Sequence, residues 1–175
     1  MPLFGGSKRP KLDGLTKEEE KRRDALNPEV MRRAGEKGVA GQGVAALGIL
    51  REKTDAEPSD FLWPWLLGSQ YLSFQRYTPA IEAFNQAIQR DDAEVRGYYG
   101  AGTAYFQAGE AKLNLGAAAT DDVVPPSLTP DNLYHEALRN FKKALELTDE
   151  KSERDQLQQA VAAIDRALAR RAGRL

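Results

Sequence analysis

Residues 61–92 read FLWPWLLGSQYLSFQRYTPAIEAFNQAIQRDD, and both halves of this stretch recur later in the chain. In the first half, Leu67-Gly68 and Tyr71 align with Ala101-Gly102 and Tyr105. The second half aligns at a larger offset, where Tyr77, Ala80-Ile81, Phe84 and Ala87-Ile88 match Tyr134, Ala137-Leu138, Phe141 and Ala144-Leu145. Because the second offset exceeds the first, the second copy carries an insertion in its middle, at about 110–132.

The repeated unit is composed of two segments with helical periodicity. We predict one helix over about 61–75 and a second over about 79–90, each with apolar residues at helical spacing. Only Arg76-Tyr77 separates these helices, so they must lie antiparallel. A period of about 34 residues built from two such segments is typical of arrays of helical hairpins. The sequence therefore predicts an all-α fold.

Composition excludes several classes of chemistry. The chain has 175 residues, 41% of them hydrophobic and 29% charged, which suits one helical, soluble domain with a tail. It contains no cysteine, which rules out disulfides, thiolate metal sites and a cysteine nucleophile. Its single histidine, His135, cannot by itself build a zinc site. We expect no metal, no cofactor and no catalytic activity, and we expect His135 at the surface.

The two ends of the chain are basic and the middle is acidic. Residues 1–53 carry 12 Lys and Arg against 8 Asp and Glu, residues 54–150 carry 7 against 15, and residues 151–175 carry 6 against 3. This asymmetry favours ends that fold back on the middle or meet an anionic partner. An adaptor that binds nucleic acid or an anionic membrane through these ends is therefore kept as an alternative.

The N-terminal part of the chain, up to Lys53, is expected to add helices to the repeats. Residues 1–13 have no periodicity and are predicted to be a disordered basic tail. The predicted helical extension, residues 14–53, begins at a Thr16 cap and starts a second helix at Asn27-Pro28, with Asn27 as its cap. Residues 54–60 are a predicted linker. The glycines after Gly35 do not follow a strand, which argues against a nucleotide-binding loop. We expect the extension to pack on the first repeat.

The remainder of the chain, residues 61–175, is predicted to be one domain of stacked hairpins. Repeat one covers 61–94, and repeat two covers 95–151 with the insertion at about 110–132. The threonine-proline pairs Thr78-Pro79 and Thr129-Pro130 each suit a helix start, with threonine as the cap. A final helix over 152–172, capped by Ser152, has an apolar stripe that can cover the last hairpin.

These residues resemble the tetratricopeptide repeat family, whose pattern is W-x2-L-G-x2-Y, then A-x3-F, then P, within a repeat of about 34 residues. The matching residues are Leu67, Gly68, Tyr71, Ala80, Phe84 and Ala87 in copy one, and Gly102, Tyr105, Ala137, Phe141 and Ala144 in copy two. The departures are Pro64 and Tyr98 for the family's Trp, Ala101 for its Leu, and Asp92 and Asp149 for its closing Pro. The resemblance covers residues 61–150 and implies a short right-handed superhelix of hairpins with a C-terminal capping helix.

The resemblance also implies a binding surface, because members of the family bind partner segments on a concave face made by the first helix of each hairpin. The residues that would lie on this face are Leu62, Trp65, Ser69, Leu72, Ser73, Arg96, Tyr99, Thr103, Phe106 and Gln107. Steps of three and four put each set on one side of its helix. The Lys, Asn and Arg clamp with which some members hold a C-terminal carboxylate is missing. The implied function is a scaffold or assembly subunit that binds an apolar or helical protein segment.

A second interpretation is that the chain covers this face itself and acts as a structural subunit. The first predicted helix of copy one is apolar nearly all round, which is typical of burial on both sides. Its cover would be the insertion, through residues 123–128, or the N-terminal segment. We expect the insertion to face Trp65 and Tyr99 and to determine specificity. No leader or membrane-spanning run is evident, so we expect a cytoplasmic protein; the partner and the oligomeric state stay open.

Overall fold

The computed structural model describes residues 12–35, 38–118, 120–121 and 123–173, and this part of the chain is helical and contains no strand. The helices are α1 (Lys17–Asp24), α2 (Asn27–Ala34), α3 (Gly38–Ala56), α4 (Leu62–Ser73), α5 (Tyr77–Arg90), α6 (Val95–Leu115), the 3-10 turn η1 (Gly116–Ala118), α7 (Pro130–Leu147) and α8 (Lys151–Arg171). The all-α prediction is confirmed. None of the described helices is both long and apolar enough to cross a membrane.

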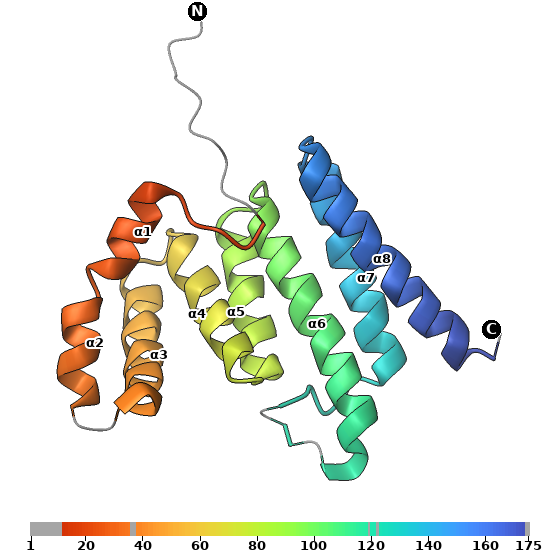
Figure 1. The fold of residues 1–175 in the computed structure, drawn as a ribbon, viewed down its shortest axis with the longest axis horizontal. Helices are drawn as coiled ribbons and strands as arrows, with labels where there is room; N and C mark the ends of the chain where they lie inside the picture. Colours follow the sequence, from red (N-terminus) through yellow and green to blue (C-terminus); the bar gives the residue numbers. More distant parts are fainter. Residues whose placement is uncertain (1–11, 36–37, 119, 122, 174–175) are drawn as a thin grey trace, which may run out of the picture.

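The helices form a row in chain order (Figure 1). Three pairs, α2 with α3, α4 with α5 and α6 with α7, pack as neighbours, and α8 packs on α7 at the end of the row. The pairs also contact one another through α3 against α4 and α5 against α6. The N-terminal helices therefore pack on the first repeat, as expected. Between α4 and α5 the turn needs a left-handed residue, and Gln75 adopts a φ of 56° there.

Two buried clusters hold this row together. The larger lies between α3, α4, α5 and α6 and has Phe84 near its centre, with 1% of its surface exposed. Glycines on α4 and α6 make room for that ring: a Cβ at Gly68 would lie 2.9 Å from it, and one at Gly100 would lie closer still. The smaller cluster joins α7 and α8 to α6, with Phe141 packed on Gly102 in the same way. The aromatic residues that repeat in the sequence thus fill equivalent spaces between helices.

Local capping follows the sequence in some places. Thr16 and Glu19 form a capping box at α1, in which each side chain accepts a hydrogen bond from the backbone N–H of the other residue. Thr129 caps α7 by accepting from the Asn132 N–H. Asp60 accepts from the Leu62 N–H at the start of α4.

Three predicted caps are wrong. Asn27 lies inside α2, because the backbone is already helical at Leu26, and no side chain caps this helix. The final helix begins at Lys151, and Ser152 lies inside it with its hydroxyl donating to the Glu150 carboxylate. In both places the helix starts before the residue that was expected to cap it.

The third wrong cap is Thr78, because α5 begins one residue earlier, at Tyr77. The Thr78 hydroxyl donates to the carbonyl of Asp121 in the insertion. The side chain therefore bonds a distant segment of the chain instead of the first turn of its own helix.

Some predicted boundaries also need correction. Helix α3 runs to Ala56, so the expected linker 54–60 shrinks to its last few residues. Most of the expected basic tail lies outside the described residues, but Leu12, placed in that tail, is 1% exposed. The tail prediction is wrong at that residue, because the leucine has an apolar site to fill.

The insertion does not lie where the sequence suggested. The Val123 carbonyl accepts from the Tyr77 N–H, and Val124 is buried against the larger cluster at the start of α5. Lys112 donates to three carbonyls, those of Pro125, Pro126 and Leu128, which fixes the loop to the far end of α6. Trp65 lies near the start of α4, at the opposite end of the helices. The expectation that the insertion faces Trp65 and Tyr99 is therefore wrong.

Candidate interaction surface

The ten residues predicted to bind a partner lie on α4 and α6, and we call the surface they define the α4–α6 face. The described residues before α1 cross its upper end, from the start of α6 to the start of α1 (Figure 1). We call these residues, 12–16, the strap. Near the starts of α4 and α6, Leu62, Trp65 and Arg96 are exposed by only 2%, 5% and 3%. The upper part of the predicted face is thus closed by the chain itself.

Arg96 is the residue that fastens the strap. Its guanidinium donates to both carboxylate oxygens of Glu19, at 2.8 and 2.9 Å, and to the Gly14 carbonyl at 3.2 Å. A further bond of 3.1 Å reaches Glu94, the residue just before α6. The guanidinium also lies over the rings of Phe61 and Trp65, at 5.2 and 5.3 Å from their centres. A buried arginine is stable here because two carboxylates and two aromatic faces surround it.

Charges and burial shift the pKa values of groups around the strap. Burial raises the pKa of Glu19, but the hydrogen bonds from Arg96 and from Thr16 outweigh it, and the net pKa is lowered from its ordinary value of 4.5. Glu19 therefore stays ionised at neutral pH and keeps its pairing with Arg96. In α6, burial and the nearby charge of Asp13 raise the pKa of Tyr99.

The other strap contacts are apolar. Leu12 packs into the smaller cluster with Val95 and Phe141, while Leu15 packs against the larger cluster of α4 and α5. The two leucines, three residues apart, therefore pack against different clusters. Their contacts and the Arg96 bonds together make the strap a closely fitted cover.

The other predicted residues are placed as follows. Tyr99 accepts a hydrogen bond from the Gln156 side chain of α8, and Phe106 packs against Tyr134 with ring centres 5.9 Å apart. Thr103 donates to the Tyr99 carbonyl, and Ser69 to that of Trp65. Leu72 is half-buried against the larger cluster, whereas Ser73 and Gln107 are exposed. The lower part of the α4–α6 face is therefore divided between a contact with α8 and an open side next to α3.

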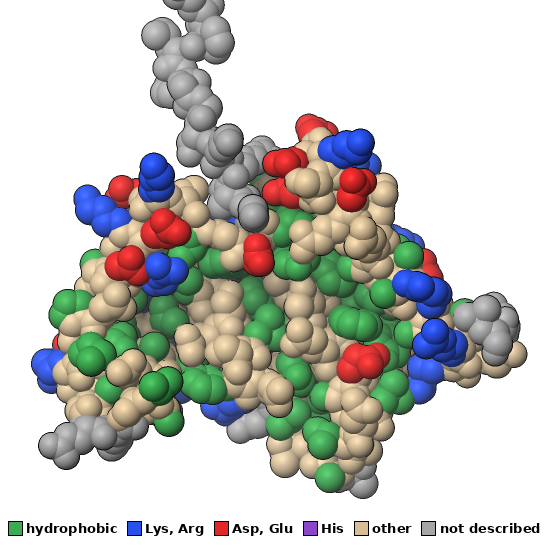
Figure 2. All heavy atoms as spheres, in the orientation of Figure 1, with side chains coloured by type: hydrophobic (Ala, Val, Ile, Leu, Met, Phe, Trp, Pro, Cys, Tyr) green, Lys and Arg blue, Asp and Glu red, His purple; other side chains and the backbone are tan. Residues whose placement is uncertain are grey.

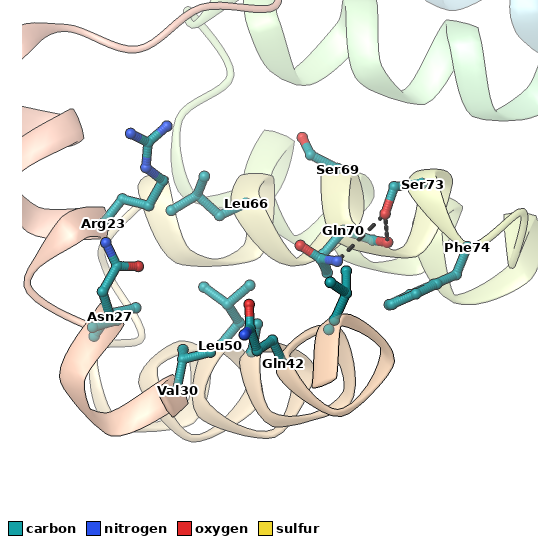
Figure 3. A pocket seen from close by; sticks show the side chains of 14 residues that line it. Arg23, Asn27, Val30, Gln42, Leu50, Leu66, Ser69, Gln70, Ser73 and Phe74 are labelled. Carbon is teal, nitrogen blue, oxygen red and sulfur yellow. Dashed lines mark hydrogen bonds between the residues drawn. The ribbon is translucent and has the colours of Figure 1, made fainter. Parts of the chain in front are cut away.

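On that open side a groove of about 570 Å³ lies between α2, α3 and α4 (Figure 3). Its lining residues are Arg23, Leu26, Asn27, Val30, Val39, Gln42, Gly43, Ala46, Leu50, Leu66, Ser69, Gln70, Ser73 and Phe74. Arg23 and Asn27 lie at one end and Phe74 at the other, with apolar side chains from all three helices between them. Two predicted residues, Ser69 and Ser73, belong to it. We call it the α2–α4 groove.

Unusual exposure of apolar side chains accompanies this groove. Val39 is 84% exposed and Phe74 39% exposed, and both line it. In the space-filling view, hydrophobic side chains gather over the α2–α3 end and the lower end of α6, while charged ones lie along the upper rim and over α8 (Figure 2). A Cβ on Gly43 would meet the tip of the Phe74 ring, so the glycine lets this partly exposed ring lie close against α3. The groove thus combines an apolar floor with amide and hydroxyl groups at its edge.

Sequence reasoning missed the strap residues and the share of α2 and α3 in the groove. The spacing of Leu12, Leu15 and Glu19 around the Thr16 cap was a usable signal, because two leucines before a capping box need somewhere to pack. The basic N-terminus and the acidic middle predict ion pairs of the kind that Arg22 makes with Glu57 and Asp60, but the Glu19–Arg96 pair has the opposite sense. On α2, Leu26 and Val30 lie one helical turn apart and mark an apolar side.

The described residues were also compared with the requirements of a metal site. They contain no cluster of three or more histidine or acidic side chains that could hold a metal ion. His135 is exposed, as expected. A comparison of the sequence with protein-family models finds no match, and neither does a comparison with the curated proteins.

Proposed function

We propose that this chain is a non-catalytic protein-interaction module of the tetratricopeptide type, and that it binds the apolar side of a helical partner segment in the α2–α4 groove. The observation that carries the proposal is the groove itself. It exposes apolar surface from three helices, including Val39 and Phe74, and edges that surface with polar side chains. An amphipathic helix with its apolar residues one turn apart has the shape and chemistry for such a site.

The packing of the hairpins supports the tetratricopeptide assignment. In that family small residues let paired helices approach, and an aromatic residue fills the space towards the next pair. Here Gly68 and Gly100 accommodate Phe84, and Gly102 accommodates Phe141. The same chemistry recurs in two hairpins of one chain, as a repeat predicts.

A groove-blocking substitution tests the function. Ala46 lies on the groove floor in α3, and Ala46→Arg would place a charged side chain where the partner packs. Val44→Arg is the matched control, because Val44 lies on the same helix, is 69% exposed and is outside the groove. Tagged wild-type protein and both variants are used to capture partners from cells of the source organism, and binding of the recovered protein is then measured with purified components.

We expect a partner that binds the wild type and Val44→Arg, and whose affinity falls at least about tenfold with Ala46→Arg, since one buried charge costs more than about 1.4 kcal/mol. Circular dichroism checks that both variants keep the helical content of the wild type. Equal affinity of all three folded proteins for every recovered partner would contradict the proposal.

A further inference from the structure

The strap contacts the α4–α6 face much as a separate peptide would. Residues 12–16 form no helix, and helix α1 after them buries no residue. Apart from the strap and Glu19, α1 is tied to the domain through Arg22, which pairs with Glu57 and Asp60 at the surface. The segment from Leu12 to Glu19 therefore adheres through a few side chains and leaves the helical row intact beneath it.

The pattern of those side chains is specific. Leu12 fills a site in the smaller cluster and Leu15, three residues on, packs on the larger one. The Gly14 carbonyl and the Glu19 carboxylate both accept from Arg96. Without the strap, this face would present two apolar sites and the side chain of Arg96. With the strap in place, only 4% of that side chain is exposed.

We propose that this face is a second docking surface, for a segment of a partner protein that carries two leucine-type side chains three residues apart and, four residues after the second, a carboxylate in the first turn of a helix. In the free protein, Leu12, Leu15 and Glu19 occupy it. The proposal rests on the interaction function proposed above and adds a closed surface to the open groove. Arg96 supplies the selection, because a segment without a carboxylate would leave its charge poorly paired beside Phe61 and Trp65.

The strap also competes with any partner segment for this surface. A tethered segment competes at an effective concentration on the order of millimolar, so a separate segment of the same chemistry binds far more weakly while the strap is in place. Weakening the strap removes that competition without altering the surface. The two states can therefore be compared in one full-length chain.

The test uses a fluorescein-labelled peptide of residues 12–24, LDGLTKEEEKRRD, and the full-length chain with Leu12→Asn and Glu19→Gln. Glutamine can still serve in the capping box, so α1 keeps its cap while the segment 12–19 loses an apolar anchor and a charge. Fluorescence anisotropy gives the peptide affinity. We expect the double variant to bind at least about tenfold more tightly than the wild type, since the tethered competitor is weakened. A control peptide with the same two substitutions should bind the double variant at least about tenfold more weakly than the original peptide.

Two results would overturn the proposal: equal peptide affinity for the wild type and the double variant, or equal affinity of the double variant for the two peptides. Hydrogen exchange on the wild type is an independent check. The Gly14, Leu15 and Thr16 amides should exchange well before those of α4 and α6, and exchange only together with these helices would also refute an opening strap. The groove variant Ala46→Arg should leave peptide binding unchanged, so failure of the α2–α4 groove and failure of this surface are separate outcomes.

Discussion

At the scale of single residues, the closeness of the helices depends on glycines opposite aromatic rings. Phe84 of α5 is buried between α4 and α6, with Gly68 on one side and Gly100 on the other. A methyl group at either position would meet the ring itself, which has no free space in which to move. These positions are therefore fixed by packing, although glycine weakens a helix by about 0.5–1 kcal/mol relative to alanine.

We expect Gly100→Ala to lower the free energy of unfolding by about 1–3 kcal/mol, because the added methyl group overpacks the Phe84 site. Gly48→Ala in α3 is the matched control. A Cβ there would find its nearest neighbour, the Arg33 Nη1 atom, 4.0 Å away, so the change should stabilise the chain by about 0.5–1 kcal/mol. Urea unfolding measures both. Effects of the same sign at the two glycines would contradict this description of the packing.

The two arginines that fasten the N-terminal segment should differ in importance. Removing the charge of buried Arg96 leaves two carboxylates without their main partner. We therefore expect Arg96→Met to lower the free energy of unfolding by about 3 kcal/mol. Arg22 pairs with Glu57 and Asp60 while its side chain stays 34% exposed, so Arg22→Met should cost about 1 kcal/mol or less. Thermal or urea unfolding compares them, and an equal loss would show that the Arg96 pairs are not stronger than a surface pair.

At the scale of elements, α1 and the strap should respond to acid through Glu19. Its pKa is lowered in the folded chain, so its contribution to stability is fully present above its ordinary value of 4.5 and is lost as the pH falls through the lowered value. Glu19→Gln has no such charge. We expect the wild type to be more stable than Glu19→Gln at pH 7, and the difference to shrink below about pH 4. Urea unfolding at several pH values measures it, and a difference independent of pH would contradict the pairing.

The insertion should depend on one lysine. Lys112 of α6 donates to the Pro125, Pro126 and Leu128 carbonyls, and Lys112→Ala would remove all three bonds at once. We expect this variant to be cut faster by protease between residues 119 and 129 while its helical content is unchanged, because the loop loses its tie to the helix. Lys142→Ala, at an exposed site on α7, is the control and should be cut at the wild-type rate. Equal cutting of both variants would contradict the role of Lys112.

Features that depend on residues close together in the sequence could be predicted, and features that depend on distant residues could not. The helices over 61–172 follow from apolar periodicity, and Thr129 caps α7 because that bond joins residues three apart. Thr78 does not cap α5, and its hydroxyl donates to the Asp121 carbonyl, 43 residues away. No local sequence pattern predicts a bond over that separation. The burial of Leu12 could not be predicted for the same reason, since it belongs to a cluster whose other members begin at Val95. The sequence left the cover of the predicted face open between the insertion and the N-terminal segment, and in the structure the strap lies there.

At the scale of the whole molecule, the row of helices offers two surfaces in different states. The α2–α4 groove is open, with exposed apolar residues at its edge, whereas the upper α4–α6 face is closed by the strap. The N-terminal helices contribute to both, because α2 and α3 line the groove and the residues before α1 form the cover.

The exposure of Trp65 tests most directly whether the strap closes the α4–α6 face and can open. The chain has two tryptophans, so Trp63→Phe leaves Trp65 as the only one, and quenching of its fluorescence by acrylamide reports how accessible it is. We expect weak quenching with the strap intact, because Trp65 is 5% exposed, and quenching at least about twofold stronger when Leu12→Asn and Glu19→Gln are added. Equally weak quenching in both proteins, or strong quenching with the strap intact, would contradict the account.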